Sequence, residues 1–282
     1  MRVFPVILLF FTLIIALLLV DSNFRIVTTE YELYYSNLPD SFDGFRIVLL
    51  ADVHDTEFGR DNKRLISRVH DANPDIIAIS GDLLNAYGNS RAFTEQLKLA
   101  ESLIIRLTPV APVYFVTGNH EMNFSDSELE DLFLMLDIHG VHLLRNEYTL
   151  LNSNGESIFL VGIDGKTGSV AERDANLFIE EIFTTTGDNF VLMLKHSNHY
   201  LSLYSEVGVD LILSGHSHGG IVRLPFTDGL LGQQRDWFPK YTNGVYTLDD
   251  TTMLVSRGLG NATGMLRFLN NPHIAVAVLR SA

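Results

Sequence analysis

The first hydrophobic feature of the chain is an almost unbroken apolar run from Val3 to Val20. In a helix these residues span about 27 Å at about 1.5 Å per residue, close to the thickness of a bilayer's hydrocarbon core. The run has no polar face, which argues against a helix buried in a soluble core. The sequence therefore predicts a transmembrane anchor or uncleaved signal segment over residues 1–21. A cleaved signal peptide is the alternative, although Val20 and Ser22 offer only a poor cleavage site.

The charges beside this run predict its orientation. Arg2 precedes the run and Asp21 follows it. A basic residue on the N-terminal flank favours a cytoplasmic N-terminus under the positive-inside rule. We therefore expect a single-pass membrane protein, held through residues 3–20, whose folded domain lies outside the cytosol.

The rest of the chain has the pattern of a layered domain. Residues 22–44 are predicted to be a connector, and after it apolar runs of strand length alternate with amphipathic stretches of helical length. Buried strands are predicted at 46–51, 75–80, 113–117, 190–194 and 210–214, and helices at 61–72, 91–107 and 125–139. This alternation predicts one α/β domain over residues 45–282.

Turn and capping signals refine this pattern. Ser125 and Glu128 have the spacing of a capping box, which opens a helix toward His139. Asn154-Gly155 between two β-rich runs predicts a hairpin turn. A second, terminal hairpin is expected over residues 245–256.

Composition narrows the classes of partner and cofactor. The formal net charge of −14 argues against duplex nucleic acid, because binding there depends on neutralising phosphates with Lys and Arg. The chain has no cysteine, so any metal must be held by histidine, carboxylate or amide groups. No feature of the sequence indicates an obligate protein partner.

Polar motifs follow five of the predicted strands, where α/β folds place their ligand sites. They contain five of the ten histidines, together with carboxylates and glycines that allow sharp turns. In an extended segment residues i and i+2 point the same way, so a carboxylate and an imidazole at that spacing converge. The motifs are Asp52-Val53-His54, Gly81-Asp82, Gly118-Asn119-His120-Glu121, His196, and Gly215-His216-Ser217-His218-Gly219-Gly220.

In this order, the motifs resemble those of the calcineurin-like metallophosphoesterase superfamily. Further segments are similar to its membrane-associated bacterial phosphodiesterase branch, the YaeI/YkuE-like group, which often carries an N-terminal hydrophobic segment. These segments are His216 to Gly220 with Arg223-Leu224-Pro225, Tyr241 to Tyr246, Ser256 to Gly260, and Arg267-Phe268. The resemblance implies a two-layer β-sandwich flanked by helices, with the active site at one edge of the sheets and the hydrophobic helix in front.

The resemblance also implies a role for each motif residue. One metal ion would be held by Asp52, His54 and His218, the other by Asn119, His196 and His216, with Asp82 bridging the two. Two such cations clamp a phosphoryl group and lower the pKa of a shared water, which makes hydroxide available near neutral pH. These ligands suit Mn, Fe, Zn or Co.

His120 would be the catalytic residue without a metal to hold. If protonated, it could act as a general acid or as an electrostatic clamp on the leaving group. The alternative is a histidine that only supports a neighbouring ligand. Glu121 or Asp55 could orient its ring.

The expected function is hydrolysis of a phosphodiester or pyrophosphate bond in a phosphorylated small-molecule or lipid-like substrate at a membrane or envelope. Residues 230–238, which include Leu230, Leu231, Trp237 and Phe238, could form an apolar lip for an acyl chain, or could simply pack a long loop. A pyrophosphate hydrolase acting on a lipid-linked nucleotide sugar of the UDP-diacylglucosamine type is an alternative, and a phosphomonoesterase is another. A non-catalytic, metal-bound scaffold is disfavoured because every motif position is kept.

Overall fold

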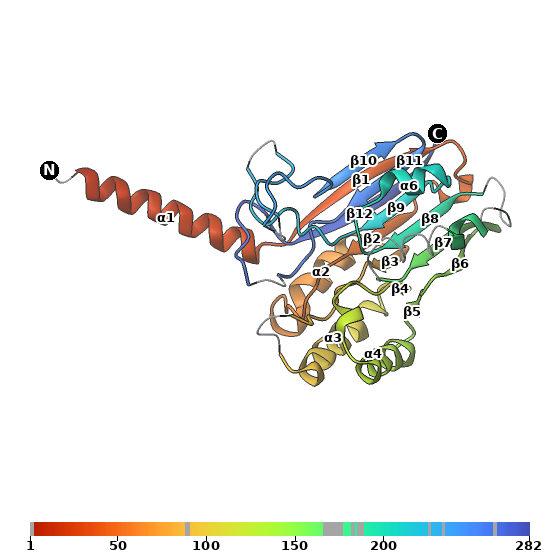
Figure 1. The fold of residues 1–282 in the computed structure, drawn as a ribbon, viewed down its shortest axis with the longest axis horizontal. Coiled ribbons are helices and arrows are strands. Elements are labelled where there is room, and N and C mark those ends of the chain that lie inside the picture. Colours follow the sequence, from red (N-terminus) through yellow and green to blue (C-terminus); the bar gives the residue numbers. More distant parts are fainter. Residues whose placement is uncertain are drawn as a thin grey trace.

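The structure is a computed structural model, and it describes residues 3–87, 91–165, 177–181, 184, 189–224, 227–232, 235–261 and 264–282. Pro225 and residues 233–234, which the sequence singled out, lie outside these ranges. The chain begins with α1 (Val3–Phe24), which projects from the domain as a separate rod (Figure 1). Phe4–Phe24 is long and apolar enough to cross a membrane, and none of its apolar window is buried. This exposure rules out the interpretation of the apolar run as a helix buried in the core of a soluble domain.

The described residues of the domain form two six-stranded sheets. The first sheet has the order β1 (Val27–Tyr35), β12 (His273–Ser281), β2 (Arg46–Leu50), β3 (Ile76–Ile79), β4 (Val113–Phe115) and β5 (His142–Leu143). The second has the order β10 (Gly244–Leu248), β11 (Thr251–Val255), β9 (Leu211–Ser214), β8 (Val191–Lys195), β7 (Glu156–Ile163) and β6 (Glu147–Ser153). The sheets pack face to face through a core of inward-facing apolar side chains, including Leu49, Leu192 and Leu254.

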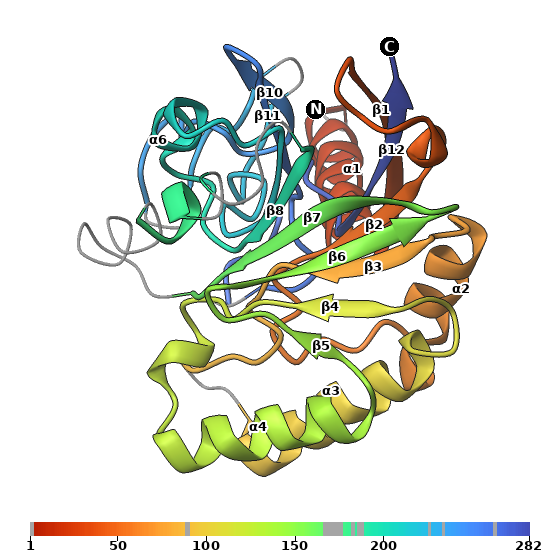
Figure 2. The same ribbon diagram turned by 90° about the vertical axis from the view of Figure 1, so that its right-hand side faces the viewer.

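Helices cover the outer faces of this sandwich. Figure 2 shows α2 (Lys63–Asp71), α3 (Phe93–Leu107) and α4 (Asp126–Ile138) against the first sheet, and α6 (Leu201–Glu206) on the side of the second. Short 3-10 turns lie at Asp40–Phe42, Arg60–Asn62 and Glu121–Asn123. A second core fills the space between the first sheet and its helices, and a third lies around α6. The two-layer sandwich that the family resemblance implied is confirmed.

Most of the predicted elements are present, and three strands were not anticipated, namely β1, β5 and β12. The capping box at Ser125 and Glu128 forms, and both hairpins occur at the expected turns. The predicted connector, 22–44, contains β1, which pairs in parallel with β12 along its full length. β1 alternates exposed residues with inward-facing ones such as Leu33 and Tyr35. The second hairpin is not terminal, because β12 follows it and inserts between β1 and β2.

Strand direction places the carboxyl ends of the central strands at the end of the domain where α1 attaches. β1 starts at Val27, directly after α1, and runs away from it together with β12. β2 is antiparallel to β12, and β3 and β4 are parallel to β2, so all three run back toward α1. The loops after these strands therefore lie near the base of the hydrophobic helix (Figure 1).

Candidate metal centre

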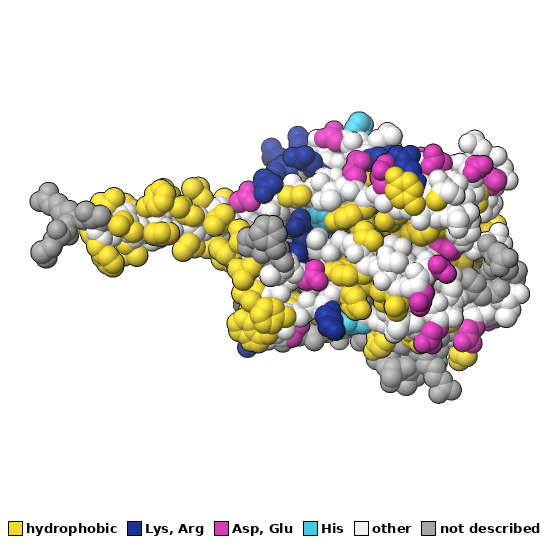
Figure 3. All heavy atoms as spheres, turned by 90° about the horizontal axis from the view of Figure 1, so that it is seen from above, with side chains coloured by type: hydrophobic (Ala, Val, Ile, Leu, Met, Phe, Trp, Pro, Cys, Tyr) yellow, Lys and Arg dark blue, Asp and Glu magenta, His cyan; other side chains and the backbone are white. Residues whose placement is uncertain are grey.

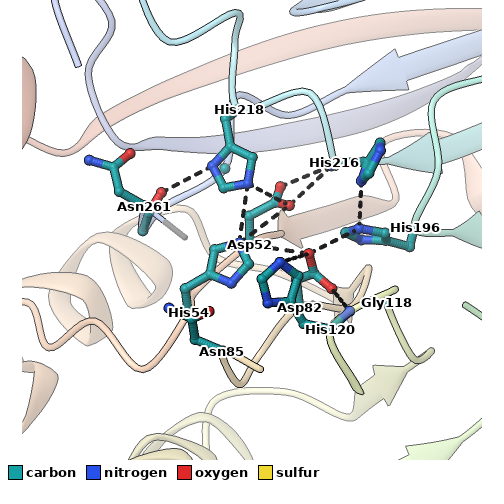
Figure 4. A network of polar contacts seen from close by, with 12 residues as sticks. Asp52, His54, Asp82, Asn85, Gly118, His120, His196, His216, His218 and Asn261 are labelled. Carbon is teal, nitrogen blue, oxygen red and sulfur yellow. Dashed lines mark hydrogen bonds and ion pairs between the residues drawn. The ribbon is translucent and has the colours of Figure 1, made fainter. Parts of the chain in front are cut away.

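Loops at the carboxyl ends of five strands bring the predicted site residues together, as Figure 4 shows. The loops after β2, β3 and β4 come from the first sheet, and those after β8 and β9 come from the second. Most of these side chains are buried, whereas Asn119 and His216 are half-buried and form the open side. In strand order the residues are Asp52, His54, Asp82, Asn119, His120, His196, His216 and His218.

Asp82 lies at the middle of the cluster. Its Oδ2 atom is 3.2 Å from Nε2 of His196, 3.7 Å from Nε2 of His54 and 3.8 Å from Nε2 of His120. Its Oδ1 atom accepts a hydrogen bond from the backbone N–H of His120 at 2.9 Å, which fixes the carboxylate plane. One carboxylate oxygen thus faces imidazoles from both sheets.

The other ligand atoms form two groups on either side of Asp82. On one side, Nε2 of His218 lies 3.4 Å from Oδ1 of Asp52 and 3.1 Å from Nε2 of His54. On the other side, Nε2 of His196 lies 3.0 Å from Oδ1 of Asn119 and 3.1 Å from Nδ1 of His216. Each group offers nitrogen and oxygen atoms to a common point.

Backbone carbonyls determine which ring nitrogens carry hydrogen. Nδ1 of His196 donates to the carbonyl of Ser80 at 2.7 Å, and Nδ1 of His218 donates to that of Gly260 at 3.3 Å. Because a carbonyl only accepts, the neutral form of each ring turns a lone pair on Nε2 toward the cluster. Lone pairs that converge on carboxylate and amide oxygens repel one another unless a cation lies between them. The residues therefore fit divalent metal ions.

Burial shapes the charges of these groups. It lowers the pKa of His54 and of His216 to about 3, and it holds the pKa of His218 well below its usual value. These three rings are neutral at pH 7, which metal binding requires. Burial also disfavours a charged His196, but the adjacent Asp82, the Asp52 carboxylate and the carbonyl of Ser80 together outweigh it and raise the pKa of His196 to about 9. Without a metal ion, the added proton on Nε2 of His196 faces the Asp82 carboxylate, at the side of the ring where a metal cation would bind.

Backbone conformation at the cluster is strained. Left-handed φ angles between 46° and 68° occur at five of the seven candidate ligands. Such conformations are uncommon for residues with a side chain and persist where the surroundings enforce them, typically at functional sites. The five residues are Asp52, His54, Asp82, His216 and His218.

Glycines let the loops after β3 and β4 approach closely. A Cβ atom on Gly118 would collide with the Asp82 carboxylate, and one on Gly81, at φ +83°, would collide with the backbone of Gly118. The glycines of the Gly-Asp and Gly-Asn-His-Glu motifs are therefore required by this contact between loops.

His120 has the opposite hydrogen pattern to His196 and His218. Its Nδ1 accepts the backbone N–H of Ala86 at 3.1 Å, so Nδ1 has no proton and the neutral ring carries its hydrogen on Nε2. Burial also lowers the pKa of His120, despite the nearby Asp82. This ring presents an N–H donor to the cluster, where His196 and His218 in their neutral, metal-binding form present lone pairs.

Neither Glu121 nor Asp55 orients His120. Glu121 is fully buried, and its carboxylate accepts the backbone N–H groups of Asp82 at 2.8 Å, Leu84 at 3.0 Å and Gly118 at 2.7 Å. It therefore joins the loop after β3 to the loop after β4. The Asp55 carboxylate pairs instead with Arg91. The sequence placed Glu121 beside the site but could not show that its partners are backbone groups.

Glu121→Gln is expected to destabilise the domain by about 1–3 kcal/mol, because the amide NH₂ would face a backbone donor that loses its acceptor. Thermal unfolding of the detergent-solubilised chain measures this loss. Glu130→Gln on the exposed side of α4 is the matched control. An unfolding temperature equal to that of the control would contradict the role assigned to Glu121.

Arg267 connects the cluster to α1, and sequence reasoning gave it no role. Its guanidinium is fully buried and donates to the carbonyls of Gly260 and Arg257, each at 2.8 Å. Gly260 is also the carbonyl that orients His218. The backbone N–H and C=O of Arg267 bind the side chain of Asn23, near the end of α1. The hydrophobic helix is therefore docked onto a segment that supports the cluster.

Comparisons with known proteins agree with this geometry. The model of a family described as calcineurin-like phosphoesterase matches residues 45–220, which include every residue of the cluster. The uncharacterized metallophosphoesterase YkuE of Bacillus subtilis is 28% identical over 91% of this chain and 86% of its own length. A transmembrane protein with metallophosphoesterase domain from Danio rerio is 27% identical over 90% of this chain, which spans only 57% of that relative.

A solved structure shows the same fold. The NAD nucleotidase NadN of Haemophilus influenzae superposes with a TM-score of 0.51 at 12% identity, over 76% of this chain and 45% of its own. At that identity the likeness concerns the fold alone. The family match extends over more than half of the chain and includes the buried cluster. The chain therefore belongs to the calcineurin-like phosphoesterase family and is a metal-dependent phosphoester hydrolase.

Proposed function

We propose that the chain hydrolyses a phosphodiester or pyrophosphate bond with two divalent metal ions. Asp52, His54 and His218 would hold one ion, and Asn119, His196 and His216 the other. The observation that carries this proposal is the position of Asp82, whose Oδ2 atom lies 3.7 Å from Nε2 of His54 and 3.2 Å from Nε2 of His196. A single oxygen facing both groups suits a ligand shared by two cations.

Divalent cations bound here would activate water and neutralise charge on the phosphoryl oxygens. The nitrogen and oxygen donors suit Mn, Fe, Zn or Co. His120 holds an N–H donor toward Asp82, at the position where a phosphoryl or leaving-group oxygen would meet it. We therefore assign His120 as a catalytic hydrogen-bond donor rather than as a metal ligand.

A pocket beside His216 supports a substrate with a second substituent on phosphorus. Its volume is about 240 Å³, and its lining includes Lys240, His199 and Tyr241. A phosphomonoester would leave this space empty, whereas a diester or pyrophosphate would place its second group there. The lining carries one cation, Lys240, which could pair with a further phosphate, and one carboxylate, Asp236, which offsets part of that charge.

The arrangement of the domain supports a substrate at a membrane. The metal cluster lies at the end of the sandwich that carries α1, and Arg267 joins the two. Beside the pocket, Trp237 and Phe238 are 67% and 66% exposed, so they do not pack the loop as core residues. If α1 spans a bilayer, we infer that these rings form an apolar lip that meets the bilayer surface or an acyl chain.

Trp237→Ser/Phe238→Ser is expected to lower turnover of a phosphodiester lipid in vesicles by about tenfold or more, because exposed aromatic area would no longer be buried in the lipid. Turnover of soluble bis-p-nitrophenyl phosphate should stay unchanged. Leu134→Ser/Ile138→Ser, which alters similarly exposed residues on α4, is the matched control. Equal turnover of the lipid by both variants would contradict the proposal that Trp237 and Phe238 form an apolar lip.

A substrate panel combined with metal analysis tests the proposed function. The full chain, purified in detergent, should hydrolyse bis-p-nitrophenyl phosphate faster than p-nitrophenyl phosphate and contain about two divalent ions per chain. Preference for the monoester would favour a phosphomonoesterase, and preference for a lipid-linked nucleotide sugar would favour the pyrophosphate hydrolase of that type. Metal binding without turnover would indicate a scaffold.

The side of the membrane needs a separate measurement. The proposal that the domain lies outside the cytosol depends on Arg2 alone, whereas a lipid-linked nucleotide-sugar substrate would require a cytosolic domain. Protease added to intact cells should digest an external domain. Protection of the domain in those cells, with digestion after lysis, would overturn this topology.

A further inference from the structure

A pocket of about 320 Å³ lies where α1 enters the domain. Four of its six lining residues are cationic and none is acidic, in a chain whose formal net charge is −14. Figure 3 shows Lys and Arg side chains where the apolar helix meets the domain. The lining, which we call the basic pocket, consists of Arg25, Ile26, Lys63, Arg64, Ser67 and Arg68. It lies on the α2 side and shares no residue with the metal cluster.

The fold holds this pocket against the end of α1. Arg25 directly follows α1, and the guanidinium of Arg64 donates to the carbonyl of Phe24, the last residue of that helix. Lys63, Arg64, Ser67 and Arg68 are spaced so that they share one face of α2. The α1 helix has 22 residues, so it spans about 33 Å, and its end falls at the level of lipid headgroups if the helix crosses a bilayer.

Most of the positive charge in the pocket is not neutralised. Arg25 forms a bidentate ion pair with Asp21. Among the ion pairs formed within the described ranges, none includes Lys63 or Arg68, and both side chains are exposed. Of the four cationic side chains in the lining, Arg25 is thus the one with a carboxylate partner in the described ion pairs. The pocket therefore keeps a net positive charge that can attract an anion. The hydroxyl of Ser67 adds a hydrogen-bond donor, and Ile26 adds an apolar wall.

We propose that the basic pocket binds the phosphate of an anionic lipid headgroup in the membrane that holds α1. Guanidinium and ammonium groups are the usual phosphate ligands in proteins, and basic residues next to a membrane helix attract anionic lipids. A lipid bound there fixes the domain at a second point beside α1. Because α1 is itself docked onto the domain, a lipid bound there would help to hold the metal cluster in one orientation toward the bilayer.

The test measures lipid binding by the full chain in neutral detergent, by titration with short-chain phosphatidylglycerol or phosphatidylcholine under native mass spectrometry. The wild-type chain should bind phosphatidylglycerol and not phosphatidylcholine. Lys63→Gln/Arg68→Gln should weaken phosphatidylglycerol binding about 30-fold, since each basic residue near a membrane contributes roughly a fivefold gain. Lys98→Gln, which removes an exposed positive charge from α3, should leave binding unchanged.

Three results would overturn the proposal. They are equal affinity in Lys63→Gln/Arg68→Gln and wild type, equal binding of the two lipids, and displacement of the lipid by glycerol 1-phosphate at equal concentration. The last would assign the pocket to free phosphate compounds. Turnover of bis-p-nitrophenyl phosphate should be unchanged in the variant, which separates a lost lipid site from misfolding. Should it fall, the charge-conserving Lys63→Arg/Arg68→Lys must retain lipid, and loss there also overturns the proposal.

Discussion

Asp82→Asn is expected to lower phosphodiester turnover by about a thousandfold or more. Asparagine keeps an oxygen to accept the backbone N–H of His120, so the loop after β3 should hold its shape. The second oxygen becomes an NH₂ group that faces Nε2 of His196 and of His54. Both candidate metal sites then lose their shared negative charge. Elemental analysis of the purified variant should show less bound metal, and bis-p-nitrophenyl phosphate measures turnover.

Asp210→Asn is the matched control for this change. Asp210 is a half-buried carboxylate that accepts the backbone N–H of Val191 and the side chain of Asn37, at the amino end of β9. It lies at the opposite end of that strand from the metal cluster. We expect its variant to keep metal and turnover, even if it is less stable. Wild-type turnover and metal content in Asp82→Asn would refute the two-metal proposal.

The sequence predicted this cluster because each of its motifs has a recognisable position next to a predicted strand. Each motif follows a buried strand, and the carboxyl ends of parallel strands meet at one edge of a sheet. The gathering of Asp52, Asp82 and Asn119 therefore follows from recognising their strands, which are parallel neighbours in the first sheet. The second sheet supplies His196, His216 and His218, and its position opposite the first came from the family resemblance rather than from periodicity.

Long-range pairings account for what the sequence could not predict. β1 has readable alternation, but only its partner β12, more than 200 residues away in the chain, makes it part of the first sheet. Glu121 acts through a backbone N–H of a distant loop and Arg267 through backbone carbonyls of nearby residues, and a backbone group has no signature in the sequence. The hydrogen on His120 depends likewise on the N–H of Ala86. Such contacts appear only once the loops are placed in space.

Replacement of His120 is expected to cause the second large loss of turnover. His120→Ala should retain metal and lose about 10²–10³-fold in turnover, the usual loss when one donor to a transition state is removed. A general acid must carry a proton that it can give away, and for an imidazole this means protonation of both nitrogens. The N–H of Ala86 occupies Nδ1, and burial lowers the pKa of His120, so the doubly protonated ring is disfavoured. The structure favours a neutral ring that donates a hydrogen bond through Nε2.

A series of aryl phosphodiesters with leaving groups of increasing pKa separates these two roles. A hydrogen-bond donor that stabilises the phosphoryl oxygens should give the same loss for good and poor leaving groups in His120→Ala. His120→Gln, whose amide N–H can reach a position near Nε2, should then recover part of the rate. A general acid predicts a loss that grows with leaving-group pKa and no recovery by glutamine, because an amide cannot transfer the proton. That pattern would show that His120 is protonated during catalysis, and that the Ala86 contact opens when substrate binds.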